Sequence, residues 1–437
     1  MNAQNKPPFK IALAGLGTVG QGVVEIIQKN AALIEARTGQ SIELVAVSSR
    51  DKSKKRNVDV SSCQWVDDAI NLADLRDVDC VVELIGGEEG IAYDLVQRSL
   101  DNGKHVVTAN KAMVARHGLQ LARNAEFKNV TLKFEAAVAG GVPAIKTLMQ
   151  GLSANNIQSV FGILNGTCNY ILSEMGMSGR SFDDVLQEAQ DIGYAEADPS
   201  FDVDGIDTAH KLCILSALAF GVKPDLDNVL ASTTGIRGVS ALDLKIAKEL
   251  GYKIKLLGSA HVNDEGQIAQ MVTPCLVDNK AQLASVDGSF NAVFIEGDFV
   301  DQVVNVGRGA GAGPTASSVV ADIIDIMRGN LGHVFGVPSE DLKDATWMDD
   351  GLTAGQFYIH LSVEDKAGVM ANISSALSMQ GLSINELIQR NFHVEGPVSV
   401  VLTTHETSRG SLDLVLEKLN AMESVLSVDS VMRIIKF

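Results

Sequence analysis

The feature that most constrains the fold is a glycine-rich turn near the start of the chain, Gly15-Leu16-Gly17-Thr18-Val19-Gly20. It follows an apolar stretch, Phe9 to Ala14, that predicts a buried strand, and it opens a helical pattern, Val19 to Asn30. The first glycine permits a tight turn, the second lets the backbone approach a pyrophosphate, and the third lets the helix pack on the strand. Amide groups at the helix start would face the anion. The turn predicts a dinucleotide-binding unit, with a plain strand-to-helix turn as the alternative.

Short apolar runs alternate with helical patterns through the first third of the chain. This alternation predicts an α/β fold built on a doubly wound parallel sheet. We expect residues 1–135 to form this Rossmann-type domain, completed by residues 307–335. Further strands are expected at Ile42 to Val47, Cys80 to Ile85, His105 to Thr108 and Thr131 to Glu135, with helices such as Ala92 to Asn102 between them.

The residues after the second strand bear on which cofactor is preferred. A site for NAD usually has Asp or Glu there, which accepts from the ribose 2′-hydroxyl. This chain has Ser49 and Arg50, with Lys52, Lys54 and Lys55 close by. Cations suit a 2′-phosphate, so we expect NADP, with NAD possible. The alternative is a solvated charge run.

The rest of the chain predicts two more domains. Residues 136–306 mix helical and strand patterns and indicate an α+β domain for catalysis and dimerisation, and residues 336–355 read as a linker. Residues 356–437 follow the order βαββαβ, which is ferredoxin-like. The main expected elements are Ile145 to Leu152, Val160 to Leu164, Phe182 to Ile192, Ile206 to Phe220, Tyr252 to Val262, Gln267 to Leu276, Asn291 to Glu296, Thr315 to Met327, Phe357 to Val363, Val369 to Gln380, Leu382 to Asn391, Pro397 to Thr404, Ser411 to Ala421 and Val425 to Ile435.

Charge and cysteine content exclude several classes of protein. The 437 residues carry 36 Lys+Arg against 54 Asp+Glu, a net charge of −18, which argues against binding to nucleic acid or anionic membranes. The longest apolar stretch, Leu212 to Val222, is too short to span a bilayer. The first ten residues lack a signal peptide's apolar core. Five scattered cysteines without a CxxC pair support neither a zinc site nor a disulfide framework, and they favour a cytoplasmic setting.

An acidic segment leads into a lysine-bearing apolar helix. Its carboxylates are Asp191, Glu196, Asp198, Asp202, Asp204 and Asp207. Asp207 and Lys211 are four residues apart, so they share a helical face, and a lysine that faces inward needs such a partner. Spacing alone favours an ordinary helix salt bridge.

Four segments together resemble homoserine dehydrogenases. The acidic segment fits their signature at Ala189, Gly193-Tyr194-Ala195, Asp198-Pro199, Asp202-Val203, Gly205, Asp207 and Lys211. The other three are Thr108-Ala109-Asn110-Lys111, Ile163 to Tyr170 and Gly307 to Thr315. The likeness covers about residues 9 to 350 and departs from the pattern at Cys168, where Thr or Ser is common. The final unit resembles an ACT domain, a regulatory module that binds small molecules, and no aspartate-kinase region is visible.

The resemblance implies the NAD(P)-dependent interconversion of L-aspartate 4-semialdehyde and L-homoserine, a step toward threonine, methionine and isoleucine. Lys211 is then the proton donor, held by Asp207. Lys111 lines the cofactor and substrate cleft and is the alternative or additional acid. The remaining implied residues are Glu196, Asp202, Gly166 and Thr167 for the substrate, and Thr108 and Gly307, with the glycine-rich turn and Arg50, for the cofactor.

The resemblance also implies a structural sodium ion. It would bind the carboxylate of Glu135 and the backbone oxygens of Val138, Gly140 and Val142, since hard cations prefer oxygen donors. From the residues alone, this stretch is a glycine-rich turn. The eight histidines show no ligand spacing.

ACT domains bind amino acids in the loop after their first strand, usually between two such domains. Here that loop contains Asp365 and Gly368, and Asn385 is a second expected contact. The implied effector is threonine and the implied assembly is a homodimer or homotetramer, with a module that only joins subunits as the alternative.

Two other functions fit parts of the sequence. A semialdehyde dehydrogenase would need a nucleophilic cysteine, and Cys168 is the one cysteine inside a motif. A non-catalytic sensor of NADP and amino acids would bind the cofactor without forming NADPH from homoserine.

Overall fold

The computed structural model describes residues 6–390 and 397–437 and divides into two compact units. The first contains Met1–Gly166, Ala209–Ala231 and Phe290–Ala345, and the second contains Thr167–Thr208, Ser232–Ser289 and Thr346–Phe437. Asn391, the last residue of one expected strand, lies outside the described residues, as do the first five residues.

The first unit is built on the parallel sheet that the sequence predicts. Its strand order is β3-β2-β1-β4-β5-β6, and every described pairing in it is parallel. The order reverses between β1 and β4, the place where sheets of this kind bind ligands. The strands are β1 (Phe9–Ala14), β2 (Ile42–Ser48), β3 (Gln64–Trp65), β4 (Cys80–Glu83), β5 (His105–Thr108) and β6 (Leu132–Lys133).

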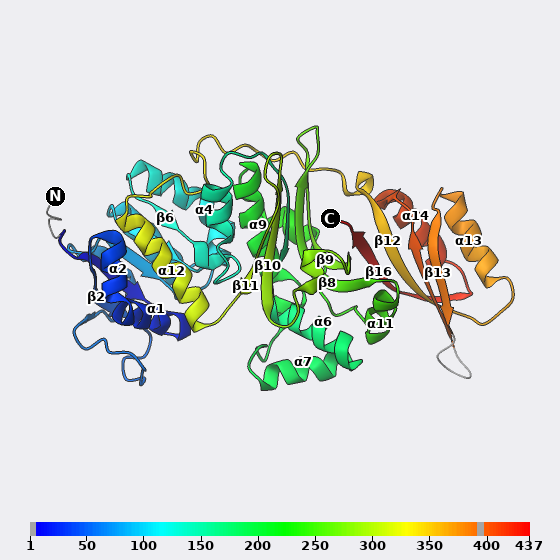
Figure 1. Cartoon of the computed structure of the whole chain (residues 1–437), viewed down its shortest axis with the longest axis horizontal. Coiled ribbons are helices and arrows are strands. Elements are labelled where there is room, and N and C mark those ends of the chain that lie inside the picture. Colours follow the sequence, from blue (N-terminus) through cyan, green and yellow to red (C-terminus); the bar gives the residue numbers. More distant parts are fainter. Residues whose placement is uncertain (1–5, 391–396) are drawn as a thin grey trace. The chain divides into compact units, whose positions relative to one another are not determined.

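Helices cover both faces of this sheet, because successive side chains of each strand point to opposite sides. Ile11 and Leu13 of β1 pack with α1, α2 and α12, whereas Ala12 and Ala14 pack with α3 and a short 3₁₀ turn. Helices α1 and α12 lie side by side although they are far apart in sequence (Figure 1). The helices are α1 (Thr18–Lys29), α2 (Ala31–Thr38), α3 (Ile91–Asp101), α4 (Lys111–Phe127) and α12 (Ala312–Met327), and the turn is η1 (Ala69–Asp74).

Three antiparallel strands complete the first unit. They are β7 (Ile157–Ile163), β10 (Phe290–Gly297) and β11 (Asp301–Arg308), with β10 in the middle. The helix α9 (Ile206–Phe220) begins in the second unit and continues in the first. Shorter elements are η2 (Glu135–Ala137), α5 (Ala144–Lys146), η3 (Thr147–Gly151) and α10 (Leu226–Ala231).

In the second unit, six strands pair in the order β8-β9-β16-β12-β14-β13. The pairings are antiparallel except for β9 with β16, which is parallel. The strands are β8 (Tyr252–Val262), β9 (Ile268–Asp278), β12 (Ala354–Val363), β13 (Ile384–Arg390), β14 (Val398–Thr404) and β16 (Val425–Ile435), and β15 (Thr407–Ser408) pairs with the start of β12. The helices are α6 (Gly166–Ser178), α7 (Phe182–Asp191), α8 (Ser200–Val203), α11 (Ala241–Glu249), α13 (Val369–Met379) and α14 (Arg409–Asn420), with 3₁₀ turns η4 (Gln282–Ser285) and η5 (Asp350–Leu352).

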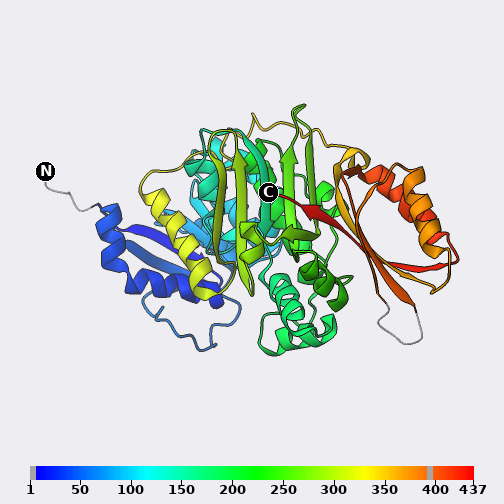
Figure 2. The same ribbon diagram turned by 45° about the vertical axis from the view of Figure 1, so that its right-hand side comes forward.

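The last part of this unit confirms the expected βαββαβ order. Helices α13 and α14 lie on one face of strands β12, β13, β14 and β16 (Figure 2). Their apolar sides form a core with the strands, in which Ile359, Leu402 and Leu412 are fully buried.

Some expected elements differ in extent. The strand expected at Thr131 to Glu135 is reduced to Leu132–Lys133, because Glu135 begins a 3₁₀ turn. Strand β11 was not expected, since its three valines stand among polar residues and glycine without a buried-strand pattern. The expected linker gives way to β12 at Ala354. Among the described residues, no helix is long and apolar enough to cross a membrane.

Candidate active site

The glycine-rich turn sits where the parallel sheet reverses its order. Gly15 has φ +100°, and a Cβ there would lie 2.4 Å from the carbonyl oxygen of Leu84, just beyond β4. A Cβ on Gly20 would lie 1.9 Å from the carbonyl oxygen of Gly15, so only glycine lets α1 start so close to β1. A Cβ on Gly17, by contrast, would meet nothing within 4 Å. The turn is therefore tightly packed at its first and third glycines and open at its second, the arrangement that leaves room for a pyrophosphate.

A buried carboxylate organises the ends of the neighbouring strands. Glu83, the last residue of β4, is fully buried and accepts hydrogen bonds from the amides of Ile85 (2.6 Å) and Gly86 (3.0 Å) and the hydroxyl of Thr108 (2.6 Å). Thr108 is predicted to bind the cofactor, but its side chain faces Glu83 inside the protein. Any cofactor contact at this position therefore falls to the backbone.

The lysine at the end of β5 begins a helix. The side chain of Asn110 caps α4 by accepting from the amide of Met113, and it donates to the carbonyl of Gly87 at 2.6 Å. Lys111 is the first residue of α4 and is half-buried. The structure thus places this candidate at the carboxyl edge of the parallel sheet.

The cationic residues after β2 lie on the surface. Arg50 is exposed. Lys52 and Arg56 cover the ring of Trp65, at 5.7 Å and 5.1 Å from its centroid. Sequence reasoning did not single out Trp65, a platform that gathers positive charge beside β2.

Lys211 lies inside the protein and contacts the strand that precedes Gly166. Its side chain belongs to α9, is 8% exposed, and donates to the carbonyl of Leu164 at 2.6 Å. The side-chain amide of Asn291 on β10 donates to the same carbonyl at 2.8 Å. Asn291 is 1% exposed, and its Oδ1 is buried without a hydrogen-bond partner among the described residues. The sequence carries no local signal for Asn291, because its partners are more than a hundred residues away.

The two glycine-rich segments of the first unit pack against each other. A Cβ on Gly140 would lie 2.2 Å from the carbonyl oxygen of Gly309, and one on Gly309 would lie 2.1 Å from the side chain of Asn291. The amide of Gly141 donates to the carbonyl of Arg308 at 3.1 Å. Gly307, a predicted cofactor residue, lies at the end of β11, where a Cβ would meet Val142 at 3.2 Å. A side chain does not fit at these glycines, because the two segments pack so closely against each other.

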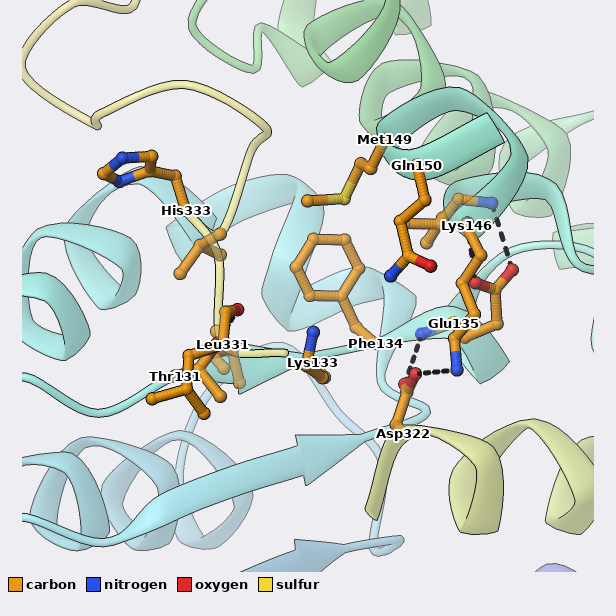
Figure 3. A pocket seen from close by; sticks show the side chains of 13 residues that line it. Thr131, Lys133, Phe134, Glu135, Lys146, Met149, Gln150, Asp322, Leu331 and His333 are labelled. Atoms are coloured by element: carbon orange, nitrogen blue, oxygen red, sulfur yellow. Dashed lines mark hydrogen bonds and ion pairs between the residues drawn. The ribbon is translucent and has the colours of Figure 1, made fainter. Parts of the chain in front are cut away.

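Glu135, the predicted carboxylate ligand of the sodium ion, lies beside an ion-pair cluster (Figure 3). The two carboxylate oxygens of Glu135 accept from the amides of Ile145 (3.0 Å) and Lys146 (2.8 Å), and its own amide donates to Asp322 (2.8 Å). The ammonium of Lys146 joins Asp322 (3.0 Å) and Asp325 (2.7 Å). Burial, followed by the nearby charge of Asp322, raises the pKa of Glu135 to about 7.

Two of the other three predicted ligands accept hydrogen bonds through their carbonyl oxygens. The carbonyl of Gly140 accepts from the hydroxyl of Ser318 at 2.7 Å, and that of Val142 accepts from the amide of Ala144 at 2.8 Å. Val138 is fully buried. A carbonyl oxygen has two lone pairs, so these bonds leave acceptor capacity. The donor set, a buried carboxylate and backbone oxygens, suits a hard cation.

Three of the four expected substrate residues lie in the second unit: Thr167 near the start of α6, Glu196 in the loop before α8, and Asp202 in α8. The hydroxyl of Thr167, at the start of α6, donates to the carbonyl of Tyr194 at 2.9 Å. The thiol of Cys168 donates to the carbonyl of Asp202 in α8 at 3.2 Å. Glu196 is exposed and Asp202 is half-buried. The structure thus joins the α6 motif directly to the acidic segment.

An arginine that sequence reasoning missed clamps this acidic segment. The guanidinium of Arg237 contacts both carboxylate oxygens of Asp204, at 2.5 Å and 3.3 Å, and the hydroxyl of Ser200 at 3.2 Å.

Asp207, the predicted partner of Lys211, lies at the start of α9 and is 3% exposed.

The cysteines do not fit a thioester mechanism. Cys168 is fully buried and acts as a packing residue beneath the acidic segment. Burial raises the pKa of Cys63, Cys80, Cys213 and Cys275, so their thiols stay protonated at neutral pH.

The expected regulatory residues lie on the surface of the C-terminal domain. Gly368 has φ +93° and caps the start of α13, and Asp365 is exposed in the same loop. The side-chain amide of Asn385, on β13, donates to the hydroxyl of Thr403 at 3.3 Å. A groove nearby is lined by Glu364 and the facing ends of α13 and α14, and it includes none of these three residues.

Comparisons with known families match all three regions of the chain. Residues 143–324 match the model for homoserine dehydrogenase, residues 15–135 match the homoserine dehydrogenase NAD-binding domain, and residues 357–424 match the ACT domain. Relatives include the homoserine dehydrogenases of Pseudomonas aeruginosa and Neisseria gonorrhoeae, each 41% identical, with 96% of both chains covered.

Solved structures agree along the whole chain. A homoserine dehydrogenase from Thiobacillus denitrificans superposes with a TM-score of 0.92 at 40% identity, covering 99% of each chain. The Staphylococcus aureus homoserine dehydrogenase at pH 7.5 gives a TM-score of 0.76 at 34% identity, covering 99% of this chain and 100% of that one. A hyperthermophilic archaeal homoserine dehydrogenase in complex with NADPH gives 0.60 at 25% identity over 73% of this chain and 97% of that one.

Proposed function

The chain belongs to the homoserine dehydrogenase family and is an NAD(P)-dependent oxidoreductase, and on that premise we propose that Lys211 is the acid–base group for interconverting L-aspartate 4-semialdehyde and L-homoserine. The observation that carries this proposal is the placement of Lys211. A lysine that is 8% exposed and bonded to the carbonyl of Leu164, two residues before Gly166, is held at one geometry.

The bound nicotinamide would supply or accept the hydride. In the reducing direction, the ammonium of Lys211 gives a proton to the carbonyl oxygen of the aldehyde as that oxygen becomes a hydroxyl. In the oxidising direction, the neutral amine takes the hydroxyl proton. Asp207, one helical turn earlier on α9, would balance the charge, and Lys111 at the start of α4 is a second cationic group for the same oxygen.

Glu196 and Asp202 would hold the substrate ammonium, with Gly166 and Thr167 lining the same site. Two features support this assignment. Both carboxylates are accessible, and the α6 motif is bonded to the acidic segment through Cys168 and Thr167. The pathway place that we propose is the supply of homoserine for threonine, methionine and isoleucine.

The decisive experiment substitutes Lys211. Lys211→Ala should lose nearly all homoserine-dependent NADPH formation while still binding NADPH, because the nucleotide turn is untouched. Lys223→Ala is the matched control, since Lys223 pairs with Asp344 at the surface. A Lys211→Ala enzyme with near wild-type turnover would remove the assignment. A wild-type protein that binds NADPH yet never forms it from homoserine would be the non-catalytic sensor.

For the cofactor we propose NADP, with NAD accepted. Exposed Arg50 and the positive charge gathered on Trp65 support this preference. Arg50→Ala should weaken NADPH binding about tenfold more than NADH binding, because a charge-assisted bond to the 2′-phosphate is lost. Equal losses for the two cofactors, measured by fluorescence titration, would refute this preference.

We also propose a structural sodium ion held by Glu135, Val138, Gly140 and Val142. The support is the donor set, a carboxylate that is 2% exposed close in sequence to buried backbone carbonyls, since a hard cation prefers oxygen donors. Thermal unfolding in NaCl against choline chloride at equal ionic strength tests the ion. Wild-type protein should gain stability from sodium and Glu135→Gln should not, and an equal response of both proteins would exclude the ion.

The C-terminal domain belongs to a class that binds small molecules, and we propose amino-acid feedback through Asp365, Gly368 and Asn385, with threonine as the effector. We further propose a homodimer or homotetramer in the cytoplasm. Free cysteines support the reducing setting. Turnover with and without L-threonine, together with light-scattering mass, tests both proposals.

A further inference from the structure

One buried carboxylate joins helix α11 to the C-terminal domain. Asp243 is 1% exposed, and its Oδ2 accepts from the amide (3.0 Å) and hydroxyl (2.7 Å) of Ser240, which closes a capping box at the start of α11. Its Oδ1 accepts from the hydroxyls of Tyr358 (2.8 Å) and Ser430 (2.9 Å) and lies 2.9 Å from Nδ1 of His360. Asp243 therefore ties α11 to strands β12 and β16 at once.

This junction depends on its polar partners. Burial alone would raise the pKa of Asp243, but the hydrogen bonds from His360 and Ser240 outweigh it and lower the pKa. Removing a single donor leaves a buried charge with fewer bonds, which is costly in a dry site. The carboxylate is thus sensitive to small shifts of β12 and β16.

The other end of the same segment contacts α8 and Asp204, next to the proposed substrate residue Asp202. Arg237 binds Asp204 in a two-pronged contact, and the amide of Ile236 donates to the carbonyl of Val203 at 2.8 Å. A Cβ on Gly235 would lie 2.0 Å from that carbonyl oxygen, so the chain presses against the end of α8 without a gap. Helix α8 carries Asp202.

The connection between these ends is short. Gly238 and Val239 alone separate Arg237 from the capping residue Ser240, and Val239 is 4% exposed and closes a turn onto Ile236 at 3.0 Å. A segment that is held at both ends over so few residues has little conformational freedom. Asp243 and the contact between Arg237 and Asp204 are therefore close together along the chain.

A second connection runs in parallel through β9. Cys275 to Val277 pair with Arg433 to Ile435 of β16. Three residues earlier on β9, Val272 exchanges hydrogen bonds with Ser232 (3.0 Å) and Thr234 (2.7 Å), which lead into Gly235. Both routes from the C-terminal domain thus arrive at the same segment.

We propose that residues 235–243 relay the state of the C-terminal domain to the carboxylate segment 198–204, with Asp243 and Arg237 as positioning residues for substrate binding. The proposal rests on the function above, in which Asp202 holds the substrate ammonium. It names the path by which an effector on the C-terminal domain changes homoserine affinity. Because coupling is reciprocal, homoserine must also change the affinity for that effector.

A double-mutant cycle in the full-length enzyme tests the relay. Ser430→Ala removes one donor from Asp243, and Arg237→Lys keeps the charge but loses the two-pronged contact. Ser362→Ala is the matched control, since Ser362 lies on β12 and donates to Asp429 rather than to Asp243. Each variant is measured for the KM of homoserine, kcat, the Kd of NADPH and Tm.

Ser430→Ala and Arg237→Lys should each raise the KM of homoserine about two- to tenfold, with smaller changes in kcat and an unchanged Kd of NADPH. The double variant should be no worse than the more severe single variant, because both act on one path. Ser362→Ala should keep the wild-type KM. Where L-threonine inhibits the wild type, Ser430→Ala should also blunt that inhibition.

Three results would overturn the relay: a lower Tm for Ser430→Ala with an unchanged KM, purely multiplicative effects in the double variant, or an equal rise in KM for Ser362→Ala. Tyr358→Phe, which removes another donor to Asp243, repeats the test if Ser430→Ala does not fold. A wild-type enzyme without homoserine-dependent turnover would defeat the proposed function instead, and it would show this before any variant is compared.

Discussion

At the scale of single residues, the carbonyl of Leu164 is a shared anchor for two side chains from distant parts of the chain. Lys211 and Asn291 both donate to it, at 2.6 Å and 2.8 Å. A lysine that must transfer a proton needs a fixed starting point, because small misplacements of a reacting group slow chemistry severely. Asn291 therefore holds in place the carbonyl to which Lys211 donates.

Asn291→Ala should therefore lower kcat by about tenfold or more while leaving NADPH binding unchanged. Asn305→Ala is the matched control, since Asn305 lies on the adjacent β11 and donates to the hydroxyl of Thr147 at 2.7 Å. Steady-state kinetics of both variants measure the effect. Equal kcat values for Asn291→Ala and the wild type would show that Lys211 holds its position without this neighbour.

The glycine turn allows a sharper comparison, because two of its glycines differ in what a methyl group would meet. Gly20→Ala should destabilise the first unit by roughly 3 kcal/mol or more, since its Cβ would collide with backbone. Gly17→Ala has open space, so its stability should stay within about 0.5 kcal/mol of wild type. Its NADPH affinity should nevertheless fall, because the methyl group enters the space left for the pyrophosphate. Thermal unfolding and NADPH titration of both variants decide the matter, and unchanged NADPH affinity in Gly17→Ala would contradict the assignment.

At the scale of elements, strong periodicity predicted position well. The expected Ile206 to Phe220, Tyr252 to Val262 and Val425 to Ile435 match α9, β8 and β16 end to end. Residues 207–217 of α9 and 254–260 of β8 are buried without interruption, so burial and local preference agree there. The order βαββαβ was predicted for the same reason, and the structure confirms it.

Elements shaped by distant contacts were not predictable. Strand β11 has no buried residue and exists because β10 pairs with it. The strand at Thr131 to Glu135 stops early because the carboxylate of Glu135 binds the amides of residues 145 and 146. In and around the candidate site, the contacts of Asn291, Glu83, Trp65 and Arg237 were not predicted. Glu83 could have been suspected as a carboxylate at the end of an apolar strand, but the partners of Asn291 and Arg237 are set by folding alone.

A histidine on β5 makes the parallel sheet sensitive to acid. Burial lowers the pKa of His105, and its Nδ1 accepts from the amide of Thr131 at 3.2 Å, which requires the neutral ring. The unfolded chain binds a proton below about pH 6.5, while the folded state resists it, so stability falls as pH falls through that value toward the lowered pKa.

His105→Asn keeps an acceptor but does not titrate. As the pH is lowered from 8 toward about 5, the Tm of the wild type should therefore fall further than the Tm of His105→Asn. His405→Asn, at an exposed position, is the control. A pH-independent difference for His105→Asn would show that protonating His105 does not strain the sheet.

At the scale of the whole chain, the C-terminal domain is joined to the rest of its unit by strand addition. Arg433 to Ile435 of β16 pair with Cys275 to Val277 of β9, whose side chains are fully buried. Ile434 is itself 6% exposed, and Arg433 covers the ring of Phe357 at 5.8 Å. The end of the chain therefore closes one edge of β9, and an uncovered edge is prone to pair with other molecules.

Two truncations separate this pairing from a general effect of chain length. A chain that stops after Ile435 keeps the whole of β16 and should have wild-type stability. A chain that stops after Met432 loses the pairing and the buried Ile434, which should cost about 3 kcal/mol or more and promote aggregation on heating. Calorimetry and light scattering of the two proteins measure the difference. If the shorter chain unfolds at the wild-type temperature and stays monodisperse, β16 does not secure the C-terminal domain, and the connection through β9 has no mechanical role.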